Sequence, residues 1–149
     1  MAVRLSAAAH RTIRDAAAGA YPEECCGLLV GIGDVDGDLW VQRAVTSRNL
    51  SAGDRLDSFE VDPKVRFDLM RELEAAEEGN VPRAPRIVGH YHSHPDHPAE
   101  PSERDRQQAF EPEFVWLIAS VIAGEVGALT AHAVTPDGFR RLPLDTESA

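Results

Sequence analysis

The sequence is poor in cysteine and in long apolar runs, and each shortage excludes a class of protein. Its only two cysteines are neighbours, Cys25 and Cys26, which cannot cross-link distant segments. Nothing therefore indicates an oxidising compartment, and we expect a cytoplasmic protein. The longest uncharged apolar run, 114–124, is about half of what a membrane-spanning helix needs, so no membrane partner is expected. Charged residues at positions 11–15 exclude a signal peptide.

Positive charge is also scarce. Lys64 is the only lysine, and 25 acidic residues against 15 basic ones give a formal net charge of −10. Such a surface repels phosphate backbones, which argues against nucleic acid as a partner. With 149 residues, 43% of them apolar, the chain has the composition of one globular domain. We expect this domain to span 1–145, with a loose polar tail at 146–149.

Apolar spacing and turn residues predict an α+β fold. Apolar residues at three- and four-residue steps predict a helix over 5–20. Asp62-Pro63 begins a second helix that Gly79-Asn80 ends, and Ser102 caps a short third one that reaches about Phe110. Predicted strands cover 25–33, 39–45, 58–61, 86–94, 114–123, 128–135 and 139–142.

The stretch GHYHSHPDHPAEPSERD, 89–105, raises the question of a metal site. Alternate side chains of a strand share a face, so His90, His92 and His94 point the same way. His92 and His94 stand at the strand end, where an open site can form. Asp105, one turn after Ser102 on a short helix, is the candidate third ligand. Three protein ligands leave one position for water, the arrangement of a catalytic zinc.

Two other interpretations of this stretch stay open. Ser-x-x-Asp also resembles a capping box, which would be structural, although both roles can hold together. HSHPDH also fits the His-x-His-x-Asp-His motif of the metallo-β-lactamase superfamily, in which Asp96 and His97 would serve a second metal. That fold is normally longer than this chain and needs further ligands downstream. We therefore interpret His97 as a loop residue that lines the cleft.

A hydrolytic zinc site also needs a proton acceptor outside the metal's ligands. Glu23 and Glu24, just before the buried strand at Cys25, are the candidates. We interpret Glu23 as the solvated start of that strand.

Together these motifs resemble the JAMM (MPN-plus, Mov34/PAD-1) metalloprotease family. The family pattern is a Glu shortly before a Gly, then His-x-His-Pro, then Ser-x-x-Asp. It falls here on Glu24 with Gly27, on His92, His94 and Pro95, and on Ser102 with Asp105. The resemblance covers about four fifths of the chain, and no motif position departs from the pattern.

The resemblance implies a cytidine-deaminase-like α+β fold, a mixed sheet flanked by helices. It implies one zinc ion per chain on His92, His94, Asp105 and a water that acts as nucleophile. Glu24 would be the general base, and Ser102 would stabilise the oxyanion. Deaminase chemistry is not expected, because the chain lacks His-x-Glu and Cys-x-x-Cys.

The single-domain form resembles the bacterial members of the family. The resemblance implies a ubiquitin-like sulfur-carrier protein as partner, cut after its C-terminal Gly-Gly. A lactamase-type hydrolase of small molecules and a non-catalytic MPN interaction module are the alternatives. The segment 58–61 and the Asn49 amide are candidate contacts for the carrier's tail, although Asn49 also fits a turn.

Overall fold

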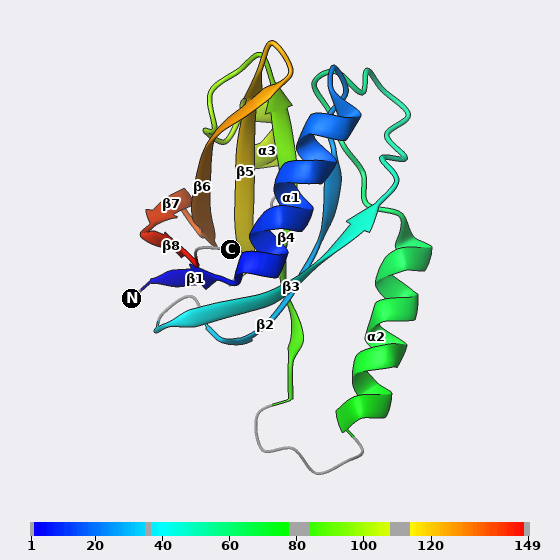
Figure 1. The fold of residues 1–149 in the computed structure, drawn as a ribbon, viewed down its shortest axis with the longest axis vertical. Coiled ribbons are helices and arrows are strands. Elements are labelled where there is room, and N and C mark those ends of the chain that lie inside the picture. Colours follow the sequence, from blue (N-terminus) through cyan, green and yellow to red (C-terminus); the bar gives the residue numbers. More distant parts are fainter. Residues whose placement is uncertain (1, 35–36, 78–83, 108–113, 148–149) are drawn as a thin grey trace.

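The computed structural model describes residues 2–34, 37–77, 84–107 and 114–147. Within them, eight strands form one sheet in the order β7-β6-β5-β4-β2-β3-β1-β8 (Figure 1). The strands are β1 (Val3–Leu5), β2 (Cys26–Gly33), β3 (Leu39–Ser47), β4 (Arg86–Pro95), β5 (Val115–Ile122), β6 (Glu125–Thr135), β7 (Gly138–Leu142) and β8 (Leu144–Thr146). The helices are α1 (Ala7–Ala20), α2 (Pro63–Glu77) and α3 (Glu103–Gln107).

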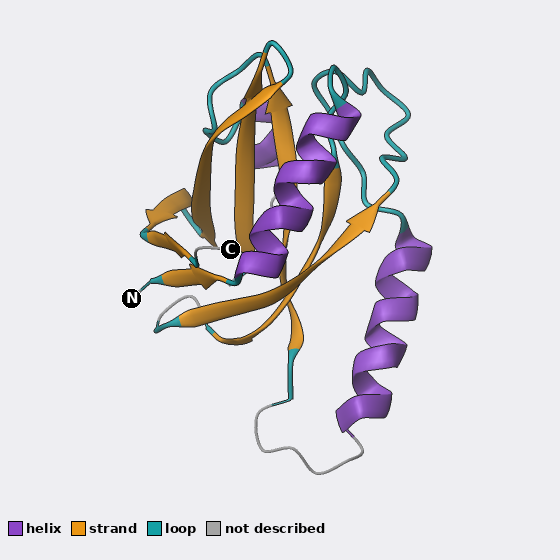
Figure 2. Cartoon of the chain, in the orientation of Figure 1, coloured by secondary structure: helices purple, strands orange, loops and turns teal. Residues whose placement is uncertain are grey.

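The sheet is mixed and strongly curled. The pairs β1–β3, β1–β8 and β4–β5 are parallel, and the other neighbours are antiparallel. The two outermost strands, β7 and β8, are separated only by Pro143, whose carbonyl accepts a 2.9 Å hydrogen bond from Val3 N. Helix α1 crosses one face and α3 lies behind the other, while α2 stands to the side (Figure 2). The predicted α+β class, with a mixed sheet flanked by helices, is confirmed.

The face under α1, called the α1 face below, holds the main apolar core. Ser6 caps the helix by accepting a hydrogen bond from Ala9 N, at 3.0 Å. Ile13, at the middle of the helix, is completely buried. The strand residues that pack with the helix in this cluster include Leu29, Val41, Tyr91, Leu117, Ala119 and Ala131.

The opposite face, called the site face below, has smaller apolar clusters. One joins Cys26, Phe59 and Trp116, and another joins Leu28 and Val30 to Leu69 of α2. These clusters leave the end of β4 near Pro95 without an apolar cover, and polar side chains occupy that end.

The predicted strand at 58–61 is wrong, since only an isolated bridge joins Asn49 to Val61. The Asn49 amide takes the place of strand pairing. Its Oδ1 accepts hydrogen bonds from Ser51 N and Glu60 N, both at 3.0 Å. Its Nδ2 donates to Ser58 O at 2.9 Å and to Glu24 O at 3.1 Å. One side chain therefore satisfies main-chain groups that a strand partner would otherwise hold.

Both ends of the domain also differ from the prediction. The short strands β1 and β8 were not predicted, and Thr146, assigned to a loose tail, lies in β8. Glu147 N donates to Leu5 O at 3.0 Å, so two of the four tail residues are part of the sheet region. Residues 148–149, the predicted helix end near Phe110 and the Gly79-Asn80 stop lie outside the described residues. In the described part of the chain, no helix is long and apolar enough to cross a membrane.

Candidate metal centre

Three buried side chains converge where β4 meets α3. His92 Nε2 and His94 Nε2 are 3.0 Å apart, and Asp105 Oδ2 lies 3.3 Å from the first and 3.1 Å from the second. His92 is completely buried, and His94 and Asp105 are nearly so. The alternation of β4 places both histidines on the site face, and α3 brings Asp105 to them.

These distances fit a metal ion. Two atoms bound to one tetrahedral ion at about 2.0–2.1 Å lie roughly 3.3 Å apart, close to the three distances observed. Hydrogen bonding accounts less well for the arrangement. If His94 Nδ1–H donates to Pro98 O, neutral rings leave only one N–H, on His92 Nε2, to serve all three contacts. His92 Nδ1 and Glu24 Oε1 are, in addition, buried without a hydrogen-bond partner in the described structure. The donor set of two imidazoles and a carboxylate is one that binds zinc.

His94 is oriented by the loop that follows it. Its Nδ1 lies 2.9 Å from Pro98 O, a distance at which Nδ1–H donates to that carbonyl. This hydrogen bond fixes the tautomer and leaves the Nε2 lone pair directed at the site. The Pro98 carbonyl was missed at the sequence level, because a main-chain acceptor leaves no mark in residue identity.

His92 is held by aromatic packing instead. Phe59 stacks on its ring with 4.3 Å between centroids and 16° between planes, and Trp116 contacts it edge-on at 5.5 Å. Phe59 was also missed, since no motif marks an aromatic residue in the 51–60 loop as a neighbour of β4.

Asp105 makes the capping contacts and also faces the two histidines. Ser102 N donates to Asp105 Oδ2 at 2.8 Å, while Asp105 N donates to Ser102 Oγ at 3.1 Å. This reciprocal pair is a capping box at the start of α3. The same carboxylate faces both histidines, so the cap aims the candidate ligand. Ser102 uses an oxygen lone pair in the cap, and its own hydrogen remains available to the cleft.

Glu24 is the second carboxylate of the centre. Ligand-type atoms of Glu24, His92 and His94 all lie within 4.8 Å of one another. The backbone of Glu24 is fixed, because its N donates to Arg55 O at 2.7 Å and its O accepts from Asn49. Of the two carboxylates, Asp105 is the nearer candidate for a third ligand, since it approaches both histidines to 3.3 Å or less. Glu24 thus lies beside the candidate ion with an unengaged carboxylate oxygen.

Burial and neighbouring charges set the protonation of these groups. Burial raises the pKa of Glu24 to about 8, although His94 opposes the shift. Burial also disfavours charge on Asp105, but His92, His94 and the Ser102 N–H outweigh it and hold the pKa of Asp105 well below its usual range. Burial lowers the pKa of His92. For His94 burial acts the same way, but the hydrogen bonds to Asp105 and Pro98 outweigh it and raise the pKa.

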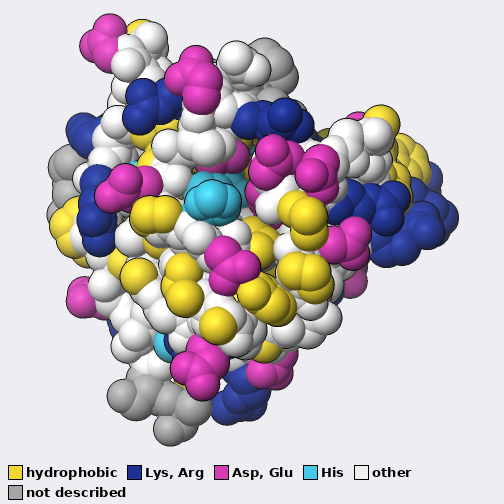
Figure 3. Space-filling view, turned by 90° about the horizontal axis from the view of Figure 1, so that it is seen from above, with side chains coloured by type: hydrophobic (Ala, Val, Ile, Leu, Met, Phe, Trp, Pro, Cys, Tyr) yellow, Lys and Arg dark blue, Asp and Glu magenta, His cyan; other side chains and the backbone are white. Residues whose placement is uncertain are grey.

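A cleft of about 400 Å³ opens onto the centre. Its lining includes Glu24, His94, Asp57, Ser102 and Arg104, together with residues of the loop 97–101. Figure 3 shows this end of the molecule, where a histidine side chain reaches the surface among acidic and hydrophobic side chains. His97 is exposed and lines the cleft, as predicted.

Other candidates lie outside the centre. His90 packs against Trp116 with 4.2 Å between ring centroids, and its pKa is lowered to about 3 by burial. Glu23 is exposed, as expected of a solvated strand start. Asp96, a second-metal ligand on the lactamase interpretation, instead accepts hydrogen bonds from Tyr21 Oη at 2.8 Å and Ala123 N at 2.9 Å. The Asn49 amide is used internally, which corrects its proposed contact with a carrier tail.

Gly27, the glycine of the family motif, is explained by the close packing of β2 against its neighbouring strands. A Cβ at this position would collide with Val45 O and with the ring of Tyr91 on the neighbouring strand. Gly27 therefore lets Tyr91 lie flat on β2, on the face opposite the histidines, and keeps β2 and β4 close beside Glu24.

The chain is also similar to known proteins. A family model described as prokaryotic homologs of the JAB domain matches residues 6–133. A desampylase from Haloferax volcanii is 36% identical over 138 residues, which cover 90% of this chain and 86% of that protein.

Two solved structures extend the comparison. A solution structure of a protein from Desulfitobacterium hafniense is 26% identical, with a TM-score of 0.81, 99% of this chain covered and 94% of that one. A JAB1/MPN domain protein from Archaeoglobus fulgidus is 18% identical, with a TM-score of 0.55, and covers 98% of this chain and 97% of its own. The second similarity concerns the fold alone, and it is the fold that the motifs predicted.

Proposed function

We propose that this chain is a zinc-dependent metallopeptidase. It belongs to the family of prokaryotic homologs of the JAB domain and is a hydrolase of the JAMM type. Its substrate in this proposal is a ubiquitin-like sulfur-carrier protein, cut at the peptide or isopeptide bond after the C-terminal Gly-Gly. The observation that carries the proposal is the convergence of His92, His94 and Asp105 beside the unengaged carboxylate of Glu24.

In this proposal the chemistry is divided among five side chains and the ion. His92, His94 and Asp105 would hold one zinc ion, which would supply the positive charge that acidifies water and polarises the scissile carbonyl. Glu24 accepts the proton of the attacking water and returns it to the leaving nitrogen. Burial, which raises the pKa of Glu24, favours its uptake of that proton. Ser102 donates its hydroxyl hydrogen to the oxygen that gains negative charge.

The shape of the cleft supports an extended tail as substrate. Among the lining residues, Glu24 and His94 are nearly buried, while the side chains of Asp57 and Arg104 are open to solvent. A chain that reaches Glu24 and His94 must bring its backbone close to these side chains, and glycine allows the closest approach. The desampylase from Haloferax volcanii, similar over most of its length, supports a protein conjugate as the substrate class.

The experiment uses carrier proteins from the same organism, fused through Gly-Gly to a short peptide or joined to a lysine side chain. Zinc-loaded protein should release the group after the second glycine, as read by mass spectrometry. The Glu24→Gln variant serves as the inactive control. Replacing the second glycine of the carrier by alanine should slow cleavage sharply, because a Cβ would hinder the close approach of the tail backbone to Glu24 and His94.

Two outcomes contradict the proposal. If carriers stay intact while small amides or esters are hydrolysed, the chain is a hydrolase of small molecules. If neither is cut and the protein holds zinc, it is a non-catalytic binding module. A cytoplasmic location is part of the proposal and rests on the two adjacent cysteines, both free thiols.

A further inference from the structure

The backbone conformation and the hydrogen bonds of Asp96 fix its position, although it is not part of the metal centre. It has a φ of 57°, a left-handed conformation that is uncommon for a residue with a side chain. Its N donates to Val121 O at 2.6 Å, and its carboxylate accepts from Ala123 N at 2.9 Å. The remaining carboxylate oxygen accepts from the Tyr21 hydroxyl at 2.8 Å. One side chain thus joins the end of β4, the β5–β6 turn and the segment after α1.

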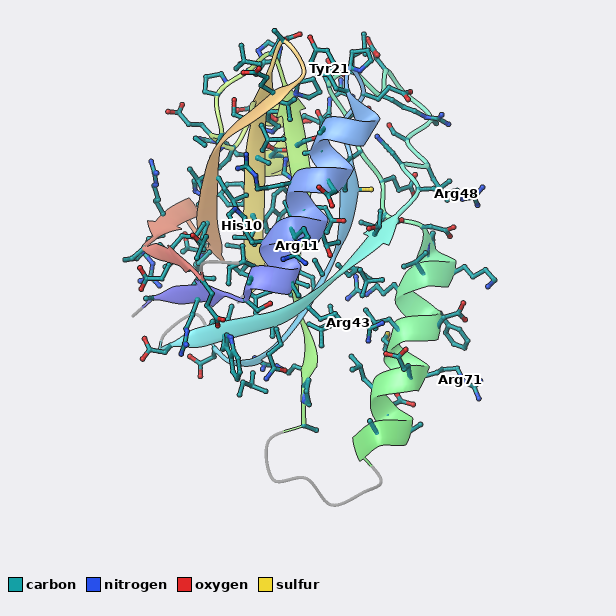
Figure 4. All side chains as sticks on the ribbon, in the orientation of Figure 1. His10, Arg11, Tyr21, Arg43, Arg48 and Arg71 are labelled. Carbon is teal, nitrogen blue, oxygen red and sulfur yellow. The ribbon has the colours of Figure 1, made fainter. Side chains whose placement is uncertain are left out.

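Tyr21 is the other half of this contact. It follows directly after α1 and lies at the top of the molecule (Figure 4). A Cβ on Gly124 would be 3.8 Å from its ring, so the ring lies beside the β5–β6 turn. Three residues later the chain reaches Glu24, and Glu23 N donates back to Ala20 O at 2.9 Å. The Tyr21 hydroxyl therefore anchors the start of the short segment that carries Glu24.

We infer that the Tyr21–Asp96 pair positions Glu24 against His94. This inference rests on the proposed function, in which Glu24 moves the proton. Because Glu24 Oε1 has no hydrogen-bond partner in the described structure, the backbone must hold this carboxylate in place. After Glu24, the Cys25 N donates to Ser93 Oγ at 2.8 Å and Asn49 holds the Glu24 carbonyl. Before Glu24, the contact with Asp96 ties the segment to the strand of the histidines.

The metal ligands have separate supports. His94 is oriented by Pro98 O, and the loop that carries Pro98 is fixed on both sides. Ser120 Oγ donates to His97 O at 2.7 Å, and Thr130 Oγ1 donates to Ala99 O at 2.6 Å. Loss of the Tyr21 hydroxyl should therefore displace Glu24 and leave the zinc ligands where they are. A positioning role predicts a loss of turnover without a loss of metal.

The experiment compares Tyr21→Phe with Tyr91→Phe, which removes the other tyrosine hydroxyl of the chain, bonded to Thr46 Oγ1 at 3.4 Å. It also compares Asp96→Gly with Asp96→Asn. Glycine keeps the left-handed backbone but removes the carboxylate, whereas asparagine can still accept from Ala123 N and donate to the Tyr21 oxygen. Each variant is measured for kcat, KM and zinc content with the carrier substrate, and for amide hydrogen exchange at Glu23 and Glu24.

Tyr21→Phe and Asp96→Gly should lower kcat about ten- to a hundredfold, with KM within about twofold and zinc content unchanged. Asp96→Asn should recover most of the loss, and Tyr91→Phe should match the wild type. The Glu23 and Glu24 amides should exchange faster in Tyr21→Phe than in Tyr91→Phe.

Three results would overturn the inference. Unchanged kcat in Tyr21→Phe and Asp96→Gly, with an active wild type, removes the positioning role. Loss of zinc in these variants shows that the pair acts through His94 instead. If the wild type cuts no carrier, the proposed function fails, and the exchange experiment still decides whether the pair holds the Glu24 segment; equal exchange in Tyr21→Phe and Tyr91→Phe would reject it.

Discussion

Alternate residues of one strand, β4, contribute to the apolar core on one face of the sheet and to the candidate metal centre on the other. On β4, Tyr91 and Ser93 face α1, where Tyr91 joins the main core and Ser93 holds the Cys25 backbone. His90, His92 and His94, the residues between and beside them, point to the site face, where His92 and His94 enter the candidate metal centre. The α1 face is covered by a helix and a contiguous apolar cluster, while the site face has small clusters and a solvent-accessible cleft.

This difference shows how an enzyme of this size can keep polar and ionisable groups buried. The strand alternation lets one face supply most of the apolar burial that stabilises the domain. The other face can then carry an unpaired carboxylate and two unpartnered histidine nitrogens, each of which costs free energy when it is buried. Mutations on the two faces should therefore separate stability from activity.

The largest effect should come from the candidate ligands on the site face. We expect wild-type protein to bind about one zinc ion per chain, and His92→Ala, His94→Ala or Asp105→Ala to lose both zinc and activity, because two donors cannot hold the ion tightly. Metal analysis after dialysis measures this. His90→Ala and His97→Ala are the controls and should retain zinc. Two zinc ions per chain, or zinc loss in His97→Ala, would favour the lactamase interpretation.

The next effect separates the base from the ligands. Glu24→Gln keeps the size of the side chain but cannot accept a proton, so turnover should fall about a hundred- to ten-thousandfold. Zinc content and the unfolding temperature should stay near the wild-type values. Glu23→Gln, one residue away and exposed, should behave like the wild type. Zinc loss in Glu24→Gln would instead make Glu24 a ligand.

The α1 face should respond in the opposite way. Ile13 is completely buried there, and Ile13→Ala should reduce the free energy of unfolding by about 2–5 kcal/mol through lost burial and a cavity. At temperatures below unfolding, zinc content and kcat should remain close to the wild type. Chemical denaturation with parallel kinetics tests this, and a selective loss of kcat in the folded variant would show that the two faces are coupled.

Motif spacing and periodicity predicted much of this structure, and the failures have physical causes. The first helix, expected over 5–20 and observed from Ala7 because Leu5 pairs in β1, has a local pattern that predicted it. The same holds for the strand that carries His92 and His94 and for the Asp62 cap, whose Oδ1 accepts from Lys64 N. The strands β1 and β8 are three residues long, too short for alternation to appear, and exist through pairing with each other and with β3. The segment 58–61 has strand-like residues, but Asn49 takes its hydrogen bonds.

At the site, the sequence motifs identified the side chains proposed to bind the metal and move the proton. They did not identify the groups that position these side chains. The Pro98 carbonyl, the Phe59 ring and the Asp96 carboxylate act through tertiary contacts to segments distant in sequence. Such contacts follow only once the strands are placed.

The smallest expected effect is a change of stability with pH. We expect it to arise from a buried histidine on the site face. His132 of β6 is buried there, its Nε2 lies 2.9 Å from Thr130 Oγ1, and burial lowers its pKa to about 4 from an ordinary value of 6.5. Below pH 6.5 the unfolded chain takes up a proton at this residue while the folded chain does not, until the pH nears 4. Stability is thus lost as the pH falls through this window, by about 2 kcal/mol between about pH 7.5 and about pH 5.

His132→Gln removes this titration and keeps an amide donor for Thr130. The variant should therefore lose about 2 kcal/mol less than the wild type over the same interval, even where it is less stable at neutral pH. His90 and Glu24 titrate in both proteins, so their contributions cancel in the difference. Urea denaturation at the two pH values measures it. Equal losses in both proteins would mean that His132 takes up its proton without unfolding, and that burial on the site face tolerates charge as readily as solvent does.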